Sequence, residues 1–292
     1  MMRAIIKLTK ATLLIMTAML INDEICAQTN SKYWKQYHSF IGFGIGPSQT
    51  KIINQPTDNT FLLEAEDNSS ISFSFEAGYY FSKYIGVATG ISFSPYKTAL
   101  SLDNYANSFD TIDSEGEIYE RRISGDQIKE IQKISFVEIP VLLCLNYPYS
   151  RIIGLYLQSG INMSIPITNS YSSSGTFTYT GYYPEYNVLL ENLPYEGFVS
   201  NIESEVQGNL CIKKLNPQAV AIGGFYFYPD KQVQISVGFL YKRMLTGIYD
   251  GSNTESLQLS TNEGQIRSMM NGCSKVTTNS AGIMVSLRYF IK

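Results

Sequence analysis

The sequence has little of what most enzymes and nucleic-acid binders need. Among its 292 residues there is one histidine, His38, and one tryptophan, and the formal net charge is only −3. A Ser-His or zinc mechanism would have to use His38, and no G-x-S-x-G or H-x-x-E-H pattern is present. No basic patch of the kind that binds nucleic acid occurs either. We therefore predict no catalytic residues, no cofactor, no metal ion and no nucleic-acid partner.

Long apolar runs are absent except at the N-terminus. Residues 11–21 are apolar, follow three basic residues and precede a polar stretch with Ile25 and Ala27 at the −3 and −1 positions of a cleavage site. A membrane-spanning helix would need roughly 20 apolar residues. We therefore predict a cleaved signal peptide, residues 1–27, and one exported domain, residues 28–292.

What recurs after the signal is alternation with a period of two, which is typical of strands with two different faces. In residues 71–81, for example, Phe73 and Phe75 share one face, and Ser74 and Glu76 share the other. A soluble barrel or sandwich would turn the apolar face inward, whereas a membrane barrel turns it outward against lipid. Seven segments show this pattern: residues 40–46, 71–81, 85–94, 136–147, 153–165, 233–241 and 281–291. Residues 219–228 are an eighth strand-like segment, whose two faces are harder to separate.

The spacing of these segments favours the membrane alternative. Very short connections alternate with long ones, as they do when tight turns occupy one rim of a barrel and free loops the other. The long connections are residues 49–70, 98–132, 166–217 and 249–279, and aromatic residues flank the short ones. We predict an all-β, eight-stranded antiparallel up-and-down transmembrane barrel in the outer membrane, with short periplasmic turns, long extracellular loops and a lipid-facing girdle of aromatic residues.

One of these strands carries a family resemblance. The stretch Phe136-Val137-Glu138-Ile139-Pro140-Val141-Leu142-Leu143 resembles the aromatic-x-Glu-Ile-Pro-aliphatic strand of the PorT-like outer-membrane β-barrels. Residues 154–160 look like the Gly-Leu-Tyr-rich strand that follows it, and residues 280–287 are similar to a barrel assembly signal. The resemblance implies a barrel surrounded by outer-membrane lipid. Some members of that family serve protein secretion or gliding.

Charged residues on the polar faces of the strands predict a filled lumen. Glu76, Glu138 and Arg288 lie on these faces, and Lys242 continues the polar face of its own strand. A charge that faces lipid is costly, so these side chains should point inward and pair with one another. We expect one structural ion-pair network. A proton or ion path is the alternative.

Two short segments could be mistaken for ligand sites. Gly42, Gly44 and Gly46 alternate with apolar residues inside one strand, so we interpret them as lumen-facing glycines and not as a phosphate loop. Residues 110–117 are acidic but lack the EF-hand spacing, and we interpret them as a solvated loop.

Two features of the predicted loops suggest specific roles. Cys211 and Cys273 fall in neighbouring loops outside the cytosol and could form a disulfide, although two free thiols are also open. Residues 170–186 are rich in Tyr, Ser and Thr and could bind a glycan or a protein. Alternatively this segment is a projecting hairpin whose tyrosines pack on each other. The aromatic residues concerned are Tyr171, Phe177, Tyr179, Tyr182, Tyr183 and Tyr186.

The sequence therefore favours a non-enzymatic outer-membrane protein with a structural or binding role through its extracellular loops. A component of envelope secretion or gliding machinery is the alternative, and a lipid-modifying barrel enzyme is the third.

Overall fold

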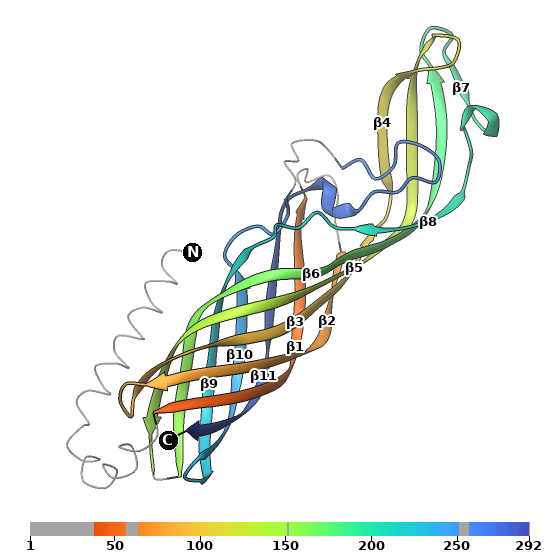
Figure 1. Cartoon of the computed structure of the whole chain (residues 1–292). Helices are drawn as coiled ribbons and strands as arrows, with labels where there is room; N and C mark the ends of the chain where they lie inside the picture. The colour runs from red at the N-terminus through yellow and green to blue at the C-terminus, as the bar shows by residue number, and fades with distance from the viewer. Residues whose placement is uncertain (1–37, 57–63, 151, 251–256, 292) are drawn as a thin grey trace, which may run out of the picture.

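The computed structural model describes residues 38–56, 64–150, 152–250 and 257–291, and this part of the chain consists almost entirely of β-strands (Figure 1). The predicted signal peptide lies outside the described residues. In the described ranges no helix has both the length and the apolar character that a membrane crossing requires.

Eight strands hydrogen-bond to one another in a closed ring. Each pairs antiparallel with the ring strand before and after it in the chain, and the ring closes where β1 pairs with β11. The predicted number and order of ring strands are thus confirmed. The strands are β1 (Ser39–Pro56), β2 (Glu64–Tyr80), β3 (Ile85–Leu102), β5 (Ile118–Pro148), β6 (Ile153–Tyr183), β9 (Asn216–Asp230), β10 (Val233–Met244) and β11 (Cys273–Ile291).

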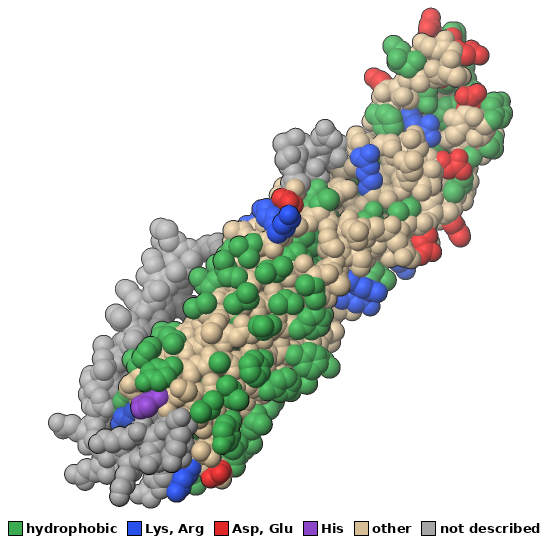
Figure 2. Space-filling view, viewed as in Figure 1, with side chains coloured by type: hydrophobic (Ala, Val, Ile, Leu, Met, Phe, Trp, Pro, Cys, Tyr) green, Lys and Arg blue, Asp and Glu red, His purple; other side chains and the backbone are tan. Residues whose placement is uncertain are grey.

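The apolar faces of these strands point outward. In β1, for example, Phe43 is 49% exposed, whereas Gly42 and Gly44 on either side of it are buried in the lumen. Figure 2 shows the result as a broad area of hydrophobic side chains on the face of the ring that it displays. A soluble barrel would bury these residues, so the structure agrees with the membrane alternative. Other outward residues include Ile71, Phe75, Ile91, Val141, Ile161, Phe239, Ile283 and Leu287.

Short and long connections alternate around the ring, as predicted. At one end lie three tight turns, at Phe81–Tyr84, at residues 149–152 and at Lys231–Gln232. All other connections between ring strands lie at the opposite end.

The predicted loops 98–132 and 166–217, however, are largely strand. β5 and β6 run 31 residues each and continue past the ring as one paired ribbon. β4 (Tyr105–Ile112) pairs with β5, while β7 (Val188–Leu190) and β8 (Ile202–Asn209) pair with β6. We call β4, β7, β8 and the parts of β5 and β6 paired with them the projecting sheet, which stands away from the ring (Figure 1).

The projecting sheet has its own hydrophobic core. Ile123, Phe177 and Tyr179 are almost fully buried together with Leu102 at the end of β3, and residues 257–272 pack over them with Leu257, Leu259, Ile266 and Met269. A smaller cluster near the tip contains Tyr119, Tyr183 and Phe198, with the first two rings stacked at 5.2 Å between centroids. Buried apolar side chains of this number stabilise the sheet without help from lipid.

The aromatic girdle beside the short turns is only half as large as predicted. Tyr79, Phe81, Tyr149, Phe225, Phe227 and Tyr289 do point outward. Their neighbours Tyr80, Tyr226 and Phe290 are buried in the lumen, because alternation turns every second residue inward. There Tyr80 and Phe290 stack with ring centroids 6.2 Å apart, and Phe40 packs beside both. These residues close the short-turn end of the lumen.

Candidate functional site

The lumen contains two buried ion pairs, and the first lies nearer the short turns. Arg288 from β11 donates its Nε–H to Glu76 Oε1 of β2 at 2.6 Å, and both residues are buried. Gln158 donates to the other carboxylate oxygen at 3.1 Å. The Arg288 guanidinium also lies 4.9 Å from the Phe40 ring centre. A Cβ at Gly42 would come within 3.0 Å of both charged side chains, so this glycine makes room for the pair.

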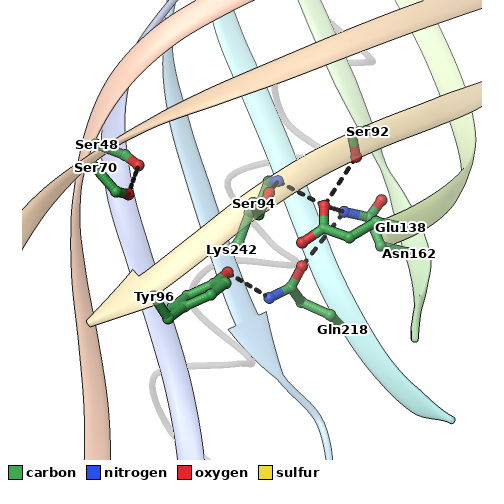
Figure 3. Close-up of polar contacts among 9 residues, drawn as sticks. All are labelled: Ser48, Ser70, Ser92, Ser94, Tyr96, Glu138, Asn162, Gln218 and Lys242. Atoms are coloured by element: carbon green, nitrogen blue, oxygen red, sulfur yellow. Dashed lines mark hydrogen bonds and ion pairs between the residues drawn. The ribbon is translucent and has the colours of Figure 1, made fainter. Parts of the chain in front are cut away.

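The second ion pair lies further from the short turns (Figure 3). Lys242 from β10 donates to Glu138 Oε2 of β5 at 2.6 Å and to Ser94 Oγ at 2.7 Å. Ser92 and Asn162 each donate to the same Glu138 oxygen at 2.9 Å. The hydrogen bonds continue from Asn162 to Gln218 and from Gln218 to Tyr96. The result is a polar layer that spans the lumen from β3 to β10.

The four predicted charges all face the lumen, but they form two separate pairs. Arg288 binds Glu76, and Lys242, not Arg288, binds Glu138. Between the pairs lies a cavity of about 40 Å³ lined in part by Glu76 and Lys242, which is room for a very few water molecules. Apolar clusters lie on either side of this polar section. Charges that are paired and packed in this way fill this section of the lumen.

The predicted disulfide between Cys211 and Cys273 is wrong, since all three cysteines of the described ranges are free. Leu210 and Ile212 point into an apolar cluster, so Cys211 between them points out to solvent. Cys273 is buried within that same cluster and donates its thiol to the carbonyl of Met269 at 3.4 Å. The Cys211 sulfur atom therefore faces solvent, whereas the Cys273 sulfur atom lies inside the apolar cluster.

The prediction that the aromatic residues of the Tyr-rich segment 170–186 bind a ligand is corrected in part. Phe177, Tyr179 and Tyr183 are buried and cannot meet a ligand. Tyr183 donates its hydroxyl to Asp113 at 3.0 Å, and burial raises the pKa of the Tyr183 phenol above its ordinary value. Tyr171 and Tyr182 are both half-buried, with Tyr182 on the opposite, solvated face of β6, and Tyr186 is exposed in the turn that follows β6. The segment is a projecting strand with its aromatic residues divided between core and surface.

A groove of about 550 Å³ lies on that solvated face, and no pattern in the sequence predicted it. Arg122 lies in it, donates to Glu120 at 2.6 Å and stacks on Tyr182 with its guanidinium carbon 4.3 Å from the ring centre. Thr178 and Thr180 of β6 add hydroxyls beside the pair. Arg122 and the two threonines are far apart in the chain and meet only because β5 and β6 stay paired beyond the ring. Without that extension, the sequence alone does not predict that they are neighbours.

Glu130 is a second residue that the sequence did not single out. Its carboxylate is fully buried and accepts hydrogen bonds from Gln132 Nε2, Ser268 Oγ and the backbone N–H of Met269, at 2.7 to 2.8 Å. Ser268 is also the N-cap of a short 3-10 helix, η2 (Met269–Gly272). Burial raises the pKa of the Glu130 carboxyl, against the lowering effect of these hydrogen bonds. Glu130 thus holds residues 268–272 on the inner face of β5.

The remaining candidates have structural contacts. His38 Nδ1 lies 3.1 Å from the carbonyl oxygen of Tyr80, beside the end of β2. Asp113 accepts the backbone N–H groups of Glu115 and Glu117 at 2.9 Å and closes the turn between β4 and β5. The hydrogen bond from Glu117 is the main cause of the lowered pKa of Asp113. Within the described ranges no three His, Cys, Asp or Glu side chains converge as metal ligands would.

Comparison with known proteins gives one family and several distant structures. The model of a family described as outer membrane protein beta-barrel domain matches residues 26–241. Ail, the attachment invasion locus protein of Yersinia pestis, solved with the heparin analogue sucrose octasulfate, is 12% identical, with 86% of this chain and 99% of Ail covered at a TM-score of 0.27. The outer membrane protein OprG of Pseudomonas aeruginosa is 12% identical (88% and 97% covered, TM-score 0.35). The outer membrane protease OmpT of Escherichia coli is 10% identical (90% and 100% covered, TM-score 0.36). No curated protein sequence matches.

Proposed function

Because this chain belongs to the family of outer membrane protein beta-barrel domains and is located in the outer membrane, we propose that it is a non-enzymatic surface protein that binds a partner through its projecting sheet. The observation that supports this most directly is the polar groove around Arg122, built on a sheet with its own core. Binding residues are most effective when a rigid scaffold positions them.

The proposal places the projecting sheet outside the cell and the three tight turns in the periplasm. An even number of ring strands returns the chain to the side on which it started, and short periplasmic turns with long extracellular connections are usual in bacterial barrels. The lumen is filled by the two ion pairs and by the apolar clusters on either side of them. This filling supports a role in displaying a surface and not in conducting solutes.

The chemistry of the groove suits a ligand rich in hydroxyl groups, such as a glycan. Arg122 and Glu120 offer charged donors and acceptors next to the hydroxyls of Thr178 and Thr180, and Glu191 lies in the same groove. Tyr182 adds an aromatic ring beside Arg122. Rings of this kind supply rigid contact area at low entropic cost, with adaptable hydrogen bonds around them. A protein surface is the second kind of partner that such a groove could accept.

Binding by the purified full-length protein to arrays of bacterial and host glycans tests the proposal. Arg122→Ala should weaken binding by about tenfold or more, which corresponds to about 1.4 kcal/mol. Glu205→Ala, a change of one exposed charge on β8 outside the groove, is the matched control and should bind as the wild type does. Equal binding by wild type and Arg122→Ala, or no binding to any glycan or surface protein, would sink the proposal.

A component of envelope machinery is the second candidate. Its support is the resemblance of residues 136–143 to the Glu-Ile-Pro strand of the PorT-like family, some of whose members serve secretion or gliding. Co-purification from native membrane separates the two functions. A stable stoichiometric protein partner favours machinery, and its absence favours the surface receptor. We propose no lipid-modifying chemistry, since the Glu76 and Glu138 carboxylates are engaged in ion pairs and the Glu130 carboxylate in hydrogen bonds.

A further inference from the structure

Two lysines meet on the outer wall at the edge of the apolar band. On β3 the outward residues run Ile91, Phe93 and Pro95 and then reach Lys97. On β5 they run Ile139, Val137 and Ser135 and then reach Lys133. Lys97 and Lys133 are direct partners in the pairing of these two strands, and both side chains are exposed.

This arrangement is unfavourable for the protein alone. Residues directly opposite on neighbouring strands have Cβ atoms about 4.5–5.5 Å apart, and like charges at this separation destabilise the pair. Neither lysine forms an ion pair with a described residue, although three ion pairs occur in that part of the chain. Lys129, on the same face of β5 four residues further from the apolar band, adds another exposed positive charge. Glu66, the exposed acid diagonal to Lys97 on β2, makes no ion pair with it, so the two ammonium groups have no carboxylate within ion-pair distance among the described residues.

The position of the pair indicates which anion would reach it. At the edge of an apolar band, acyl chains end and lipid headgroups begin, and long lysine side chains extend toward that level. On the other side of β5, Ser170 pairs with Lys133 and is exposed, so a hydroxyl lies beside the Lys133 ammonium group. A phosphate monoester offers three acceptor oxygens and a charge of about −1.5 to −2 to such a group of donors.

Basic residues also mark the band edge on the opposite wall. Arg243, exposed on β10, follows Tyr241, the last of the outward apolar residues of that strand. In Figure 2, Lys and Arg side chains likewise gather where the hydrophobic band ends. A charge distribution around the circumference fits a surrounding lipid annulus better than one soluble ligand.

We propose that Lys97 and Lys133, with Ser170, bind the phosphate group of an outer-leaflet glycolipid. This inference uses the outer-membrane location and the outward orientation of the projecting sheet, and it does not depend on the groove around Arg122. Bound lipid phosphate removes the repulsion between the two ammonium groups, so the barrel wall is more stable with the lipid than without it.

Binding of lipid A to the full mature protein in detergent tests the site, with dephosphorylated lipid A and phosphatidylglycerol as parallel probes. The double variant Lys97→Gln/Lys133→Gln should bind lipid A at least tenfold more weakly than the wild type. Lys83→Gln/Arg267→Gln removes the same charge elsewhere and should bind as the wild type does. Wild type should prefer lipid A to both other probes, and millimolar inorganic phosphate should not displace it.

Thermal unfolding supplies a readout that does not depend on affinity. Without lipid the Lys97→Gln/Lys133→Gln protein should unfold at the same or a higher temperature than the wild type, and lipid A should raise the wild-type midpoint more. Equal lipid A binding by the two proteins overturns the proposal, as does equal binding of dephosphorylated lipid A. Displacement by inorganic phosphate would make this a free-anion site, and preference for phosphatidylglycerol would place it in the other leaflet. Either result overturns the assignment to an outer-leaflet glycolipid.

Discussion

At the scale of single residues, Glu138 shows how the lumen is filled. Lys242, Ser92 and Asn162 all donate to its Oε2, whereas Oε1 has no protein partner in the described structure. The cavity of about 40 Å³ beside this layer is large enough for water. The negative charge of Glu138 is therefore stabilised in the lumen mainly by Lys242, and the positive charge of Lys242 by Glu138.

Glu138→Gln should destabilise the barrel because it leaves the Lys242 ammonium buried and unpaired. Removing one partner of a buried ion pair commonly costs about 3–5 kcal/mol, whereas replacing both with apolar groups is often neutral. Urea unfolding in lipid vesicles measures the loss, and Glu138→Leu/Lys242→Met should recover most of it. Unchanged stability in Glu138→Gln would show that the lysine finds other partners or loses its proton.

Thiol labelling tests the state of the cysteines. Cys211 is exposed, while Cys144 and Cys273 are buried, so a maleimide should modify Cys211 alone in the folded, unreduced protein and all three after denaturation. A buried thiol reacts slowly because the reagent cannot reach it. If only Cys144 reacts after denaturation, Cys211 and Cys273 are bonded and the described geometry of that region is incorrect.

The identity of the lumenal residues could be predicted from the sequence, but their partners could not. Alternation alone places Glu76, Glu138, Arg288 and Lys242 on inward faces. Which acid meets which base depends on strand register, and Glu138 and Lys242 are 104 positions apart. The predicted disulfide between Cys211 and Cys273 was wrong for a related reason. The presence of both residues in neighbouring predicted loops does not show which way each side chain points.

At the scale of elements, the sequence located the eight ring strands and missed the continuation of β5 and β6. Inside the band, large apolar residues alternate with Gly, Ser and polar groups, and this contrast marks a strand clearly. Beyond the band the outward residues become Lys, Ser and Thr, and Pro166 lies opposite a register shift. Such a stretch resembles a loop in composition, and only the burial of Phe177 and Tyr179 shows that one face still packs on a core.

The attachment of residues 268–272 to β5 should weaken as the pH rises. The folded pKa of Glu130 is raised, so the folded state favours the protonated carboxyl, and its contribution to stability is lost as the pH climbs from the ordinary Glu value through the raised one. Hydrogen exchange at the Met269 amide, corrected for intrinsic rates, should show less protection at pH 8 than at pH 5. Glu130→Gln should remove this difference. Equal protection of the wild type at both pH values would contradict the prediction.

At the scale of the whole molecule, the ring and the projecting sheet form one continuous wall. β5 and β6 belong to both, and residues 257–272 return from the projecting sheet to the start of β11. The lumen is occupied by aromatic residues near the tight turns, by the two ion pairs and by the apolar cluster beyond them. With its lumen filled, the molecule offers a partner the projecting sheet and not a channel.

A protease added outside the cell should reach the chain only on the side of the apolar band that carries the projecting sheet. Added protease should cut intact cells at exposed turns of the projecting sheet, around residues 114–116 and 184–187, and should spare Ser82 and Lys83 in the tight turn. The reason is that lipid and barrel separate the two ends. Permeabilised cells serve as the control, since both ends are then reachable. Cleavage at the tight turn in intact cells would reverse the orientation.

The pairing of β5 with β6, which continues past two register shifts, also sets a distance. At a rise of about 3.3 Å per residue, the stretch of β5 from Lys133 at the band edge to Arg122 in the groove measures roughly 36 Å. Barrel strands are tilted, so the height of the groove above the band edge is less than this length, and headgroups with their attached sugars occupy the first part of that height in an outer leaflet. A partner of the groove therefore meets it beyond the inner sugars of the surrounding lipids, and it can be engaged while the coat around the barrel stays in place.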